Sequence, residues 1–376
     1  MLMLFQIGES NMKINKKIRV GIIGATGMVG QRFLTLLSDH PWFEITALAA
    51  SKRSSGKTYK DAVSGRWKMD VEIPSNVAGL RVMDINDIDN VSASVDMIFS
   101  AVDMPKDEIK EIEDAYAKTE TPVVSNNSAH RWTEDVPMLI PEINDDHCEV
   151  IESQKRRLGT SRGFVAVKPN CSIQAYVPLL AAWKEYEPQE LAISTYQAIS
   201  GAGKTFKEWP EMIENIIPYI GGEEEKSERE PLKVLGEVKN GKIVNKEGLS
   251  ITCQCLRVPV LNGHTASVFI KFKNHPSKDQ LINKLLEFKG FPQIENLPSA
   301  PKQFIHYMTE DDRPQVKLDV DCENGMAISV GRLREDSVYD FKFIGLAHNT
   351  LRGAAGGAVL CAETLVAKGY ITNKDI

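Results

Sequence analysis

The stretch VGIIGATGMVG, residues 20–30, decides the fold of the first part of this 376-residue chain. Its glycines at positions 24, 27 and 30 lie between a β-branched apolar run (18–24) and a segment with helical apolar spacing (29–40). Such a turn lets backbone approach a pyrophosphate, whose oxygens then face the free N–H groups of the helix start. The spacing is GxxGxxG rather than GxGxxG, so a purely structural glycine turn is the alternative. The pattern predicts a dinucleotide site with contacts from Gly24, Thr26, Gly27, Met28 and Val29.

The segments after this turn alternate between strand and helix patterns. Apolar runs at 43–50, 95–102 and 121–126 predict buried strands, and residues 105–118 predict an amphipathic helix. This order is typical of parallel strands joined by right-handed crossovers. We therefore expect an α/β fold that begins with a Rossmann-type parallel-sheet domain over residues 12–169.

The pattern changes after residue 169. Longer and partly alternating strands are predicted at 191–200, 249–260 and 264–272, which favours a mixed sheet in a second, α+β domain over residues 170–347. The chain ends in a helix rich in small residues. We expect this segment, 348–376, to fold back onto the first domain.

The end of the second strand selects the dinucleotide. An NAD site usually has Asp or Glu there to hold the ribose 2′-OH. Residues 49–58, AASKRSSGKT, contain no acid. Ser51, Arg53 and Ser54 instead supply hydroxyls and positive charge that suit a 2′-phosphate, which predicts NADP. A solvated basic loop is the alternative.

Cys171, in VKPNCSIQA (167–175), is the candidate nucleophile. Pro169 ends a strand, and a helix is expected to begin at Asn170 or Cys171. A thiol at a helix start feels the positive end of the helix dipole, so we expect a lowered pKa and a reactive thiolate. The alternative is a small buried apolar side chain, as expected for the other five cysteines.

Arg257 and His264 lie on either side of an Asn262-Gly263 turn signal. A two-residue hairpin there places both side chains on one face of a sheet. A guanidinium can hold a carboxylate in a fork, and a histidine can transfer a proton near pH 7. A surface arginine with a capping histidine is the alternative.

Residues 200–205, SGAGKT, resemble the end of a nucleotide-binding P-loop. The motif requires a glycine five positions before Gly203, where this chain has Ala198. We therefore interpret the segment as a loop at a strand end, whose small residues allow close approach to a ligand. Its predicted cofactor contacts are Ser200, Gly201 and Gly203, and Gln197 is expected to orient a substrate.

The composition excludes several classes of protein. A net charge of −6, from 51 acidic and 45 basic side chains, gives no basic surface for nucleic acid. No apolar run approaches the roughly 20 residues that cross a bilayer. We expect no membrane partner, no metal and a cytoplasmic location with reduced thiols. Residues 1–11 are expected to be an extension before a natural start at Met12.

Five separated motifs, taken together, resemble the aspartate-semialdehyde dehydrogenases of archaea, fungi and some bacteria. They are GATGMVG, PNCSI, YQAISGAG, RVPVLNGHT and HNTLRGAAGGAVL, in the expected order over nearly all of the chain after residue 17. The resemblance implies interconversion of 4-aspartyl phosphate and aspartate 4-semialdehyde with NADP and inorganic phosphate. This step precedes threonine, methionine and lysine synthesis.

The resemblance also implies residue roles. Cys171 would form the acyl thioester, His264 would be the general acid–base and Arg257 would bind the substrate α-carboxylate. Asn349 would lie by the nicotinamide amide. Further substrate contacts would come from Gln197, Asn170, Arg131, Glu223 and Lys226.

The resemblance implies a homodimer or homotetramer built through the sheet of the second domain, which would then be catalytic and dimerising. A malonyl-CoA-type reductase on the same fold and a non-catalytic NADP-binding scaffold are the alternative functions. N-acetyl-glutamyl-phosphate reductase fits less well, because its acylated substrate amine would not need Glu223.

Overall fold

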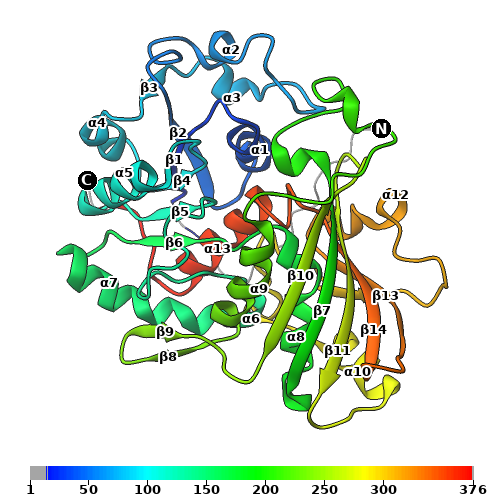
Figure 1. The fold of residues 1–376 in the computed structure, drawn as a ribbon. Helices are drawn as coiled ribbons and strands as arrows, with labels where there is room; N and C mark the ends of the chain where they lie inside the picture. The colour runs from blue at the N-terminus through cyan, green and yellow to red at the C-terminus, as the bar shows by residue number, and fades with distance from the viewer. Residues whose placement is uncertain (1–13, 15, 375–376) are drawn as a thin grey trace.

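Two six-stranded sheets organise the chain (Figure 1). The computed structural model describes residue 14 and residues 16–374, so the predictions about residues 1–11 and the domain start at residue 12 lie outside the described residues. The first sheet has the order β3-β2-β1-β4-β5-β6 and is parallel throughout. Its strands are β1 (Ile18–Ile23), β2 (Phe43–Ala50), β3 (Val82–Asp84), β4 (Met97–Ser100), β5 (Val123–Ser125) and β6 (Val165–Val167).

Helices connect the parallel strands, as the alternating pattern predicts. The strand order reverses between β1 and β4, and in sheets of this kind a ligand binds at the carboxyl ends of the strands beside such a switch. The connecting helices are α1 (Met28–Leu37), α2 (Tyr59–Ala62), α3 (Ser75–Ala78), α4 (Ile88–Ala93), α5 (Lys106–Lys118), α6 (Pro141–Asn144) and α7 (Ile151–Leu158).

The second sheet is mixed, which confirms the prediction from the longer alternating strands. Its order is β10-β7-β11-β14-β13-β12, with parallel pairs at both edges and antiparallel pairs between them. The strands are β7 (Pro188–Gln197), β10 (Ser250–Arg257), β11 (His264–Phe272), β12 (Ile305–Tyr307), β13 (Ile328–Glu335) and β14 (Phe341–Ala347). A separate hairpin joins β8 (Glu237–Lys239) to β9 (Lys242–Val244).

The helices of the second part include α9, which packs along the edge strand β10. Although the helix is rich in Glu and Lys, Glu223, Ser227 and Glu230 are buried on one side of it. These helices are α8 (Val177–Ala182), α9 (Glu223–Val234), α10 (Lys278–Glu287), α11 (Phe291–Ile294) and α12 (Val316–Asp319).

The last helix, α13 (Ala355–Ala367), lies against α1 and β5 of the first sheet (Figure 1). Its residues from Ala355 to Val366 are buried, as expected for a helix that is apolar on all sides. Glycine makes this position possible, because a methyl group at Gly357 would lie 2.3 Å from Cε of Lys168. The described helices include none long and apolar enough to cross a membrane.

A buried ion pair ties the segment before α13 to α6. The guanidinium of Arg352 donates to both carboxylate oxygens of Glu142, at 2.7 and 2.5 Å, and both side chains are almost completely buried. Nε of Arg352 also donates to Gln174. Removing one partner of such a pair destabilises the fold, because the other charge is left buried and unneutralised.

We expect Arg352→Ala to lower the free energy of unfolding by about 3–5 kcal/mol, because it leaves the Glu142 carboxylate buried without its counter-charge. Guanidinium denaturation followed by circular dichroism measures this loss. The double variant Glu142→Leu/Arg352→Met removes both charges and should recover most of it. Equal losses in the single and the double variant would contradict the explanation.

Candidate active site

The glycine turn lies where β1 meets α1, at the carboxyl edge of the parallel sheet. Gly24 has φ +81°, and a methyl group there would lie 2.3 Å from the Ala101 carbonyl oxygen. A methyl group at Gly30 would lie 2.4 Å from the Gly24 oxygen. Gly27 is exposed at the N-cap of α1, and no described side chain caps that helix. Its first N–H groups are therefore available to a pyrophosphate, which fits the predicted dinucleotide.

The other predicted residues of the turn, Thr26, Met28 and Val29, are half-buried around it. The basic turn after β2 is partly open to solvent. Ser51 and Arg53 are exposed there, whereas Ser54 is buried and its N–H donates to the Ser51 carbonyl. The exposed Ser51 and Arg53 fit a ribose phosphate, while the burial of Ser54 indicates a role in shaping the turn.

Cys171 and His264, the residues predicted to be the reactive pair, contact each other. Sγ of Cys171 lies 3.3 Å from Nε2 of His264. Nδ1 of His264 accepts from the Ala198 N–H at 3.1 Å, so the neutral ring carries its proton on Nε2 and presents it to the sulfur. Burial and the charge of Arg257 lower the pKa of His264 to about 3, so the ring is neutral near pH 7.

The expectation of a lowered pKa for Cys171 is wrong. Burial, and then the Glu223 carboxylate, raise the pKa of this partly exposed thiol to about 11. The expected helix start is only a four-residue 3-10 turn, Ser172–Ala175, which is too short to build the field of a longer helix. The positive charges of Lys168, Arg131 and Arg257 oppose the effect of burial without overcoming it.

Arg257 and His264 do meet, although the predicted hairpin is wrong. β10 and β11 are not neighbours, because β7 lies between them. The two side chains converge at the end of β7, where Nη1 of Arg257 donates to the Ala198 carbonyl at 2.7 Å. A methyl group at Gly201 would lie 3.0 Å from that nitrogen and 3.2 Å from Nε2 of His264. A larger residue at position 201 would therefore press on both side chains.

The loop after β7 connects this centre to the turn before α13. Nδ2 of Asn349 donates to Oγ of Ser200 at 2.8 Å, and Oδ1 of Asn349 accepts from the Gly263 N–H at 2.8 Å. The Gly203 carbonyl accepts from Lys68 of the first domain. The loop thus contacts both Lys68 of the first domain and Asn349 before α13. The cofactor contacts of Ser200, Gly201 and Gly203 stay a prediction.

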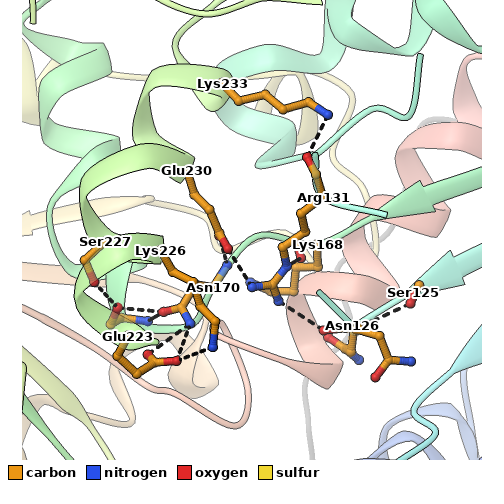
Figure 2. A network of polar contacts seen from close by, with 12 residues as sticks. Ser125, Asn126, Arg131, Lys168, Asn170, Glu223, Lys226, Ser227, Glu230 and Lys233 are labelled. Carbon is orange, nitrogen blue, oxygen red and sulfur yellow. Dashed lines mark hydrogen bonds and ion pairs between the residues drawn. The ribbon is translucent and has the colours of Figure 1, made fainter. Parts of the chain in front are cut away.

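A buried network on α9 holds the other predicted substrate contacts (Figure 2). The carboxylate of Glu223 accepts from Nδ2 of Asn170 at 3.0 and 3.1 Å and from Nζ of Lys226 at 2.7 Å. Nε2 of Gln197 lies 3.4 Å from the same carboxylate. Four of the predicted residues thus share one cluster beside Cys171.

Arg131 joins this cluster through a residue that the sequence analysis missed. Glu230 accepts from Arg131 at 2.8 Å and from the N–H of Asn170 at 2.6 Å. Ser227 lies between Glu223 and Glu230 on α9, and its hydroxyl oxygen is 3.2 Å from that of Ser172. Glu223, Ser227 and Glu230 follow a helical spacing of four and three, and this spacing was the available signal.

The site carries no metal signature, because the described residues include no cluster of three or more His, Cys, Asp or Glu side chains able to hold an ion. The fold therefore combines a parallel sheet that ends at an open helix N-terminus, a mixed sheet, and a contact between Cys171 and His264. Two family models match it. "Semialdehyde dehydrogenase, NAD binding domain" covers residues 19–151, and "Semialdehyde dehydrogenase, dimerisation domain" covers residues 178–352.

Curated relatives narrow this class. The chain is 42% identical over 360 residues to aspartate-semialdehyde dehydrogenase of Schizosaccharomyces pombe, which covers 94% of this chain and 99% of the relative. It is 40% identical over 351 residues to that of Methanothermobacter thermautotrophicus, with 93% and 99% covered. The chain belongs to the aspartate-semialdehyde dehydrogenase family.

Comparison with solved structures agrees with this family assignment. The Candida albicans aspartate semialdehyde dehydrogenase with NADP is 38% identical and has a TM-score of 0.85, with 95% of this chain and 100% of that chain covered. A Vibrio cholerae enzyme at 23% identity and a TM-score of 0.72 shares the fold.

We expect Glu223→Gln to make the Cys171 thiol more reactive and to weaken substrate binding. Loss of the carboxylate removes the largest charge that raises the Cys171 pKa, so alkylation of Cys171 by iodoacetamide at pH 8 should accelerate by up to about tenfold. The KM for a substrate with an ammonium group should rise, because the carboxylate predicted to bind that group is gone. Glu225→Gln, on the exposed side of α9, is the control and should change neither quantity. Slower alkylation in Glu223→Gln would contradict the assignment.

Proposed function

We propose that the protein is an NADP-dependent aspartate-semialdehyde dehydrogenase that converts 4-aspartyl phosphate to aspartate 4-semialdehyde, reversibly, in threonine, methionine and lysine biosynthesis. The observation that carries this proposal is the 3.3 Å contact between Cys171 and His264 beside Arg257 and Glu223, in a chain of this family. Neither a malonyl-CoA-type reductase nor a non-catalytic scaffold is favoured by the relatives.

Substrate recognition follows from the charges around the pair. Arg257 can bind the α-carboxylate through a charge-assisted fork, and Glu223 can accept from the α-ammonium. Arg131 and Lys226 offer positive charge to the phosphoryl group, with Asn170 as a further donor. Gln197, buried at the end of β7, would orient the carbonyl that Cys171 attacks.

Attack by the Cys171 sulfur on the acyl carbon of 4-aspartyl phosphate expels inorganic phosphate and leaves a thioester on Cys171. Bound NADPH supplies the hydride that reduces this acyl group. The fit of the cofactor rests on the open N-terminus of α1, on Ser51 and Arg53, and on Asn349 near the reactive pair.

His264 can donate from Nε2 to negative charge that develops on the sulfur or on the carbonyl oxygen. Its low pKa results from burial and from Arg257. A substrate carboxylate bound to Arg257 would offset the second cause and raise the pKa of His264. Substrate binding would therefore make His264 a better general acid–base. Without substrate, a ring with a pKa of about 3 rarely takes up a proton near pH 7.

In the proposed domain assignment, residues 12–169 bind NADP and residues 170–347 are catalytic and dimerising. Residues 348–376 return to the first domain. Contacts of α13 with α1 and β5 support the last part. The dimerisation-domain match supports a homodimer or homotetramer. A cytoplasmic location accords with the biosynthetic role.

We expect the purified protein to reduce NADP with aspartate semialdehyde only when inorganic phosphate is present, because phosphate must cleave the Cys171 thioester. Absorbance of NADPH measures the reaction. Cys171→Ala should lower turnover by more than about a thousandfold while NADP still binds. Cys322→Ala, a second partly exposed cysteine, is the control. Reduction without phosphate, or activity retained in Cys171→Ala, would refute the proposed reaction.

We expect Arg53→Ala to raise the KM for NADP by about tenfold to a hundredfold, because a hydrogen bond to a charged group contributes about 1.5–3 kcal/mol. The KM for NAD, which has no 2′-phosphate, should hardly change. Lys60→Ala, which removes an exposed charge from the nearby α2, is the control. Equal changes for both cofactors would show that Arg53 does not bind the 2′-phosphate.

A further inference from the structure

Two side chains of α9 bind the free edge of β10 (Figure 1). Strand β10 has a neighbouring strand on one side only, so its alternate N–H groups point away from the sheet. The N–H of Cys253 donates to Oε1 of Glu228 at 3.0 Å, and the N–H of Cys255 donates to Oε1 of Glu224 at 3.3 Å. Both carboxylates are half-buried. Glu224 and Glu228, which we call the carboxylate clamp, therefore join the helix to the strand.

The spacing of the clamp matches the two elements. Two residues of a strand span about 6.4–6.8 Å. Four residues of a helix rise by about 6.0 Å, and side chains four positions apart lie on one face. Glu224 bonds to Cys255 and Glu228 to Cys253, so α9 runs in the opposite direction to β10. Sliding the helix along the strand would lengthen both bonds together, so the clamp fixes the position of α9 along β10.

The clamp lies beside both charges that are proposed to bind the amino-acid end of the substrate. Glu223, the proposed ammonium site, directly precedes Glu224 on α9. Arg257, the proposed carboxylate site, follows Cys255 by two residues on β10. The N–H of Arg257 donates to the Ile217 carbonyl at 2.8 Å. The outward N–H groups of β10 are thus bound from Cys255 as far as the active site.

Gln197 shows that the two charges face the same site. Arg257 lies opposite Gln197 in the register of β10 and β7, and Nε2 of Gln197 is 3.4 Å from the carboxylate of Glu223. Among the residues that the structure describes, no hydrogen bond or ion pair joins the side chains of Glu223 and Arg257 directly. The distance between them therefore depends on how α9 is placed on β10.

We propose that Glu224 and Glu228 are positioning residues, which fix the distance between Glu223 and Arg257 and thereby select substrates that carry an ammonium and a carboxylate on one carbon. The inference rests on the proposed function, in which these two charges bind the substrate. An α-amino acid presents its two charges at one separation, so both contacts form only when α9 keeps its place along β10. A ligand with a carboxylate alone needs only Arg257.

The test is protection of Cys171 from alkylation by iodoacetamide at pH 8, measured by mass spectrometry of the Cys171 peptide. L-aspartate carries both charges of the amino-acid end, whereas succinate lacks the ammonium. Aspartate should protect the unmodified protein at lower concentration than succinate. In Glu224→Ala/Glu228→Ala, the aspartate concentration that halves the rate should rise about tenfold or more, because a hydrogen bond between charged groups is lost. The value for succinate should change less than about twofold.

Glu224→Gln/Glu228→Gln separates the bonds from the charges. Glutamine retains a carbonyl oxygen that can accept from each N–H, so this variant should keep the preference for aspartate. Loss of the preference in the glutamine variant would attribute the effect to the negative charges and overturn the proposal. An unchanged preference in the alanine variant would also overturn it.

Glu225→Ala is the matched control, because this exposed glutamate lies on the same helix and pairs only with Arg229 among the described residues. It should change neither protection constant. The rate without ligand should be equal in all variants, because the bonds from Asn170 to Glu223 remain. If the double alanine variant does not fold, Glu224→Ala and Glu228→Ala each remove one bond and should each reduce the preference. Full preference in both single variants would overturn the proposal.

The measurement requires neither NADP nor turnover, so the proposed reaction and the clamp can fail separately. Phosphate-dependent reduction of NADP tests the reaction. Equal protection of the unmodified protein by succinate and aspartate would show that Glu223 does not bind an ammonium, and would overturn the role of the clamp whatever the reaction.

Discussion

The completely buried carboxylate of Glu230 is the interaction on which the site depends. It accepts from Arg131, which follows the fifth strand of the first sheet, and from the N–H of Asn170, which directly precedes Cys171. One side chain on α9 therefore fixes a positive charge of the first sheet relative to the turn that carries Cys171. A carboxylate in the interior is tolerated only with such partners, so the geometry is strongly specified.

Close approach of backbone to backbone completes the positioning of Cys171. A methyl group at Gly345 in β14 would lie 1.9 Å from the Ala175 carbonyl oxygen, and one at Gly353 would lie 2.7 Å from Cβ of Cys171. The cysteine turn is thus held between the mixed sheet and the segment that leads into α13. These contacts fix Cys171 and remove part of the water around it, and loss of water favours the neutral thiol. The surrounding Lys and Arg charges must offset this effect, so reactivity depends on the arrangement of charges rather than on the local helix.

Local patterns were sufficient wherever neighbours in the sequence are also neighbours in space. The glycine turn, the parallel sheet and the mixed character of the second sheet were all predicted correctly from the spacing of apolar and small residues. The hairpin at Asn262-Gly263 was wrong because the pairing of distant strands decides sheet order, and β7 inserts between β10 and β11. Arg257 and His264 still meet, since both lie at the same end of β7. The expected thiolate at a helix start failed because burial, which no local pattern reports, outweighs a four-residue turn.

The sequence by itself determined the class of the protein, because its five motifs and its strand and helix periodicities are local properties of the chain. It also determined which residue types were available for nucleophile, acid–base and carboxylate binding. Only the tertiary structure decided how their charges act on one another. Glu223 and Glu230 lie 53 and 60 positions after Asn170, and both bond to it. Their effect on Cys171 depends on distance and desolvation, which exist only once the two sheets have packed together.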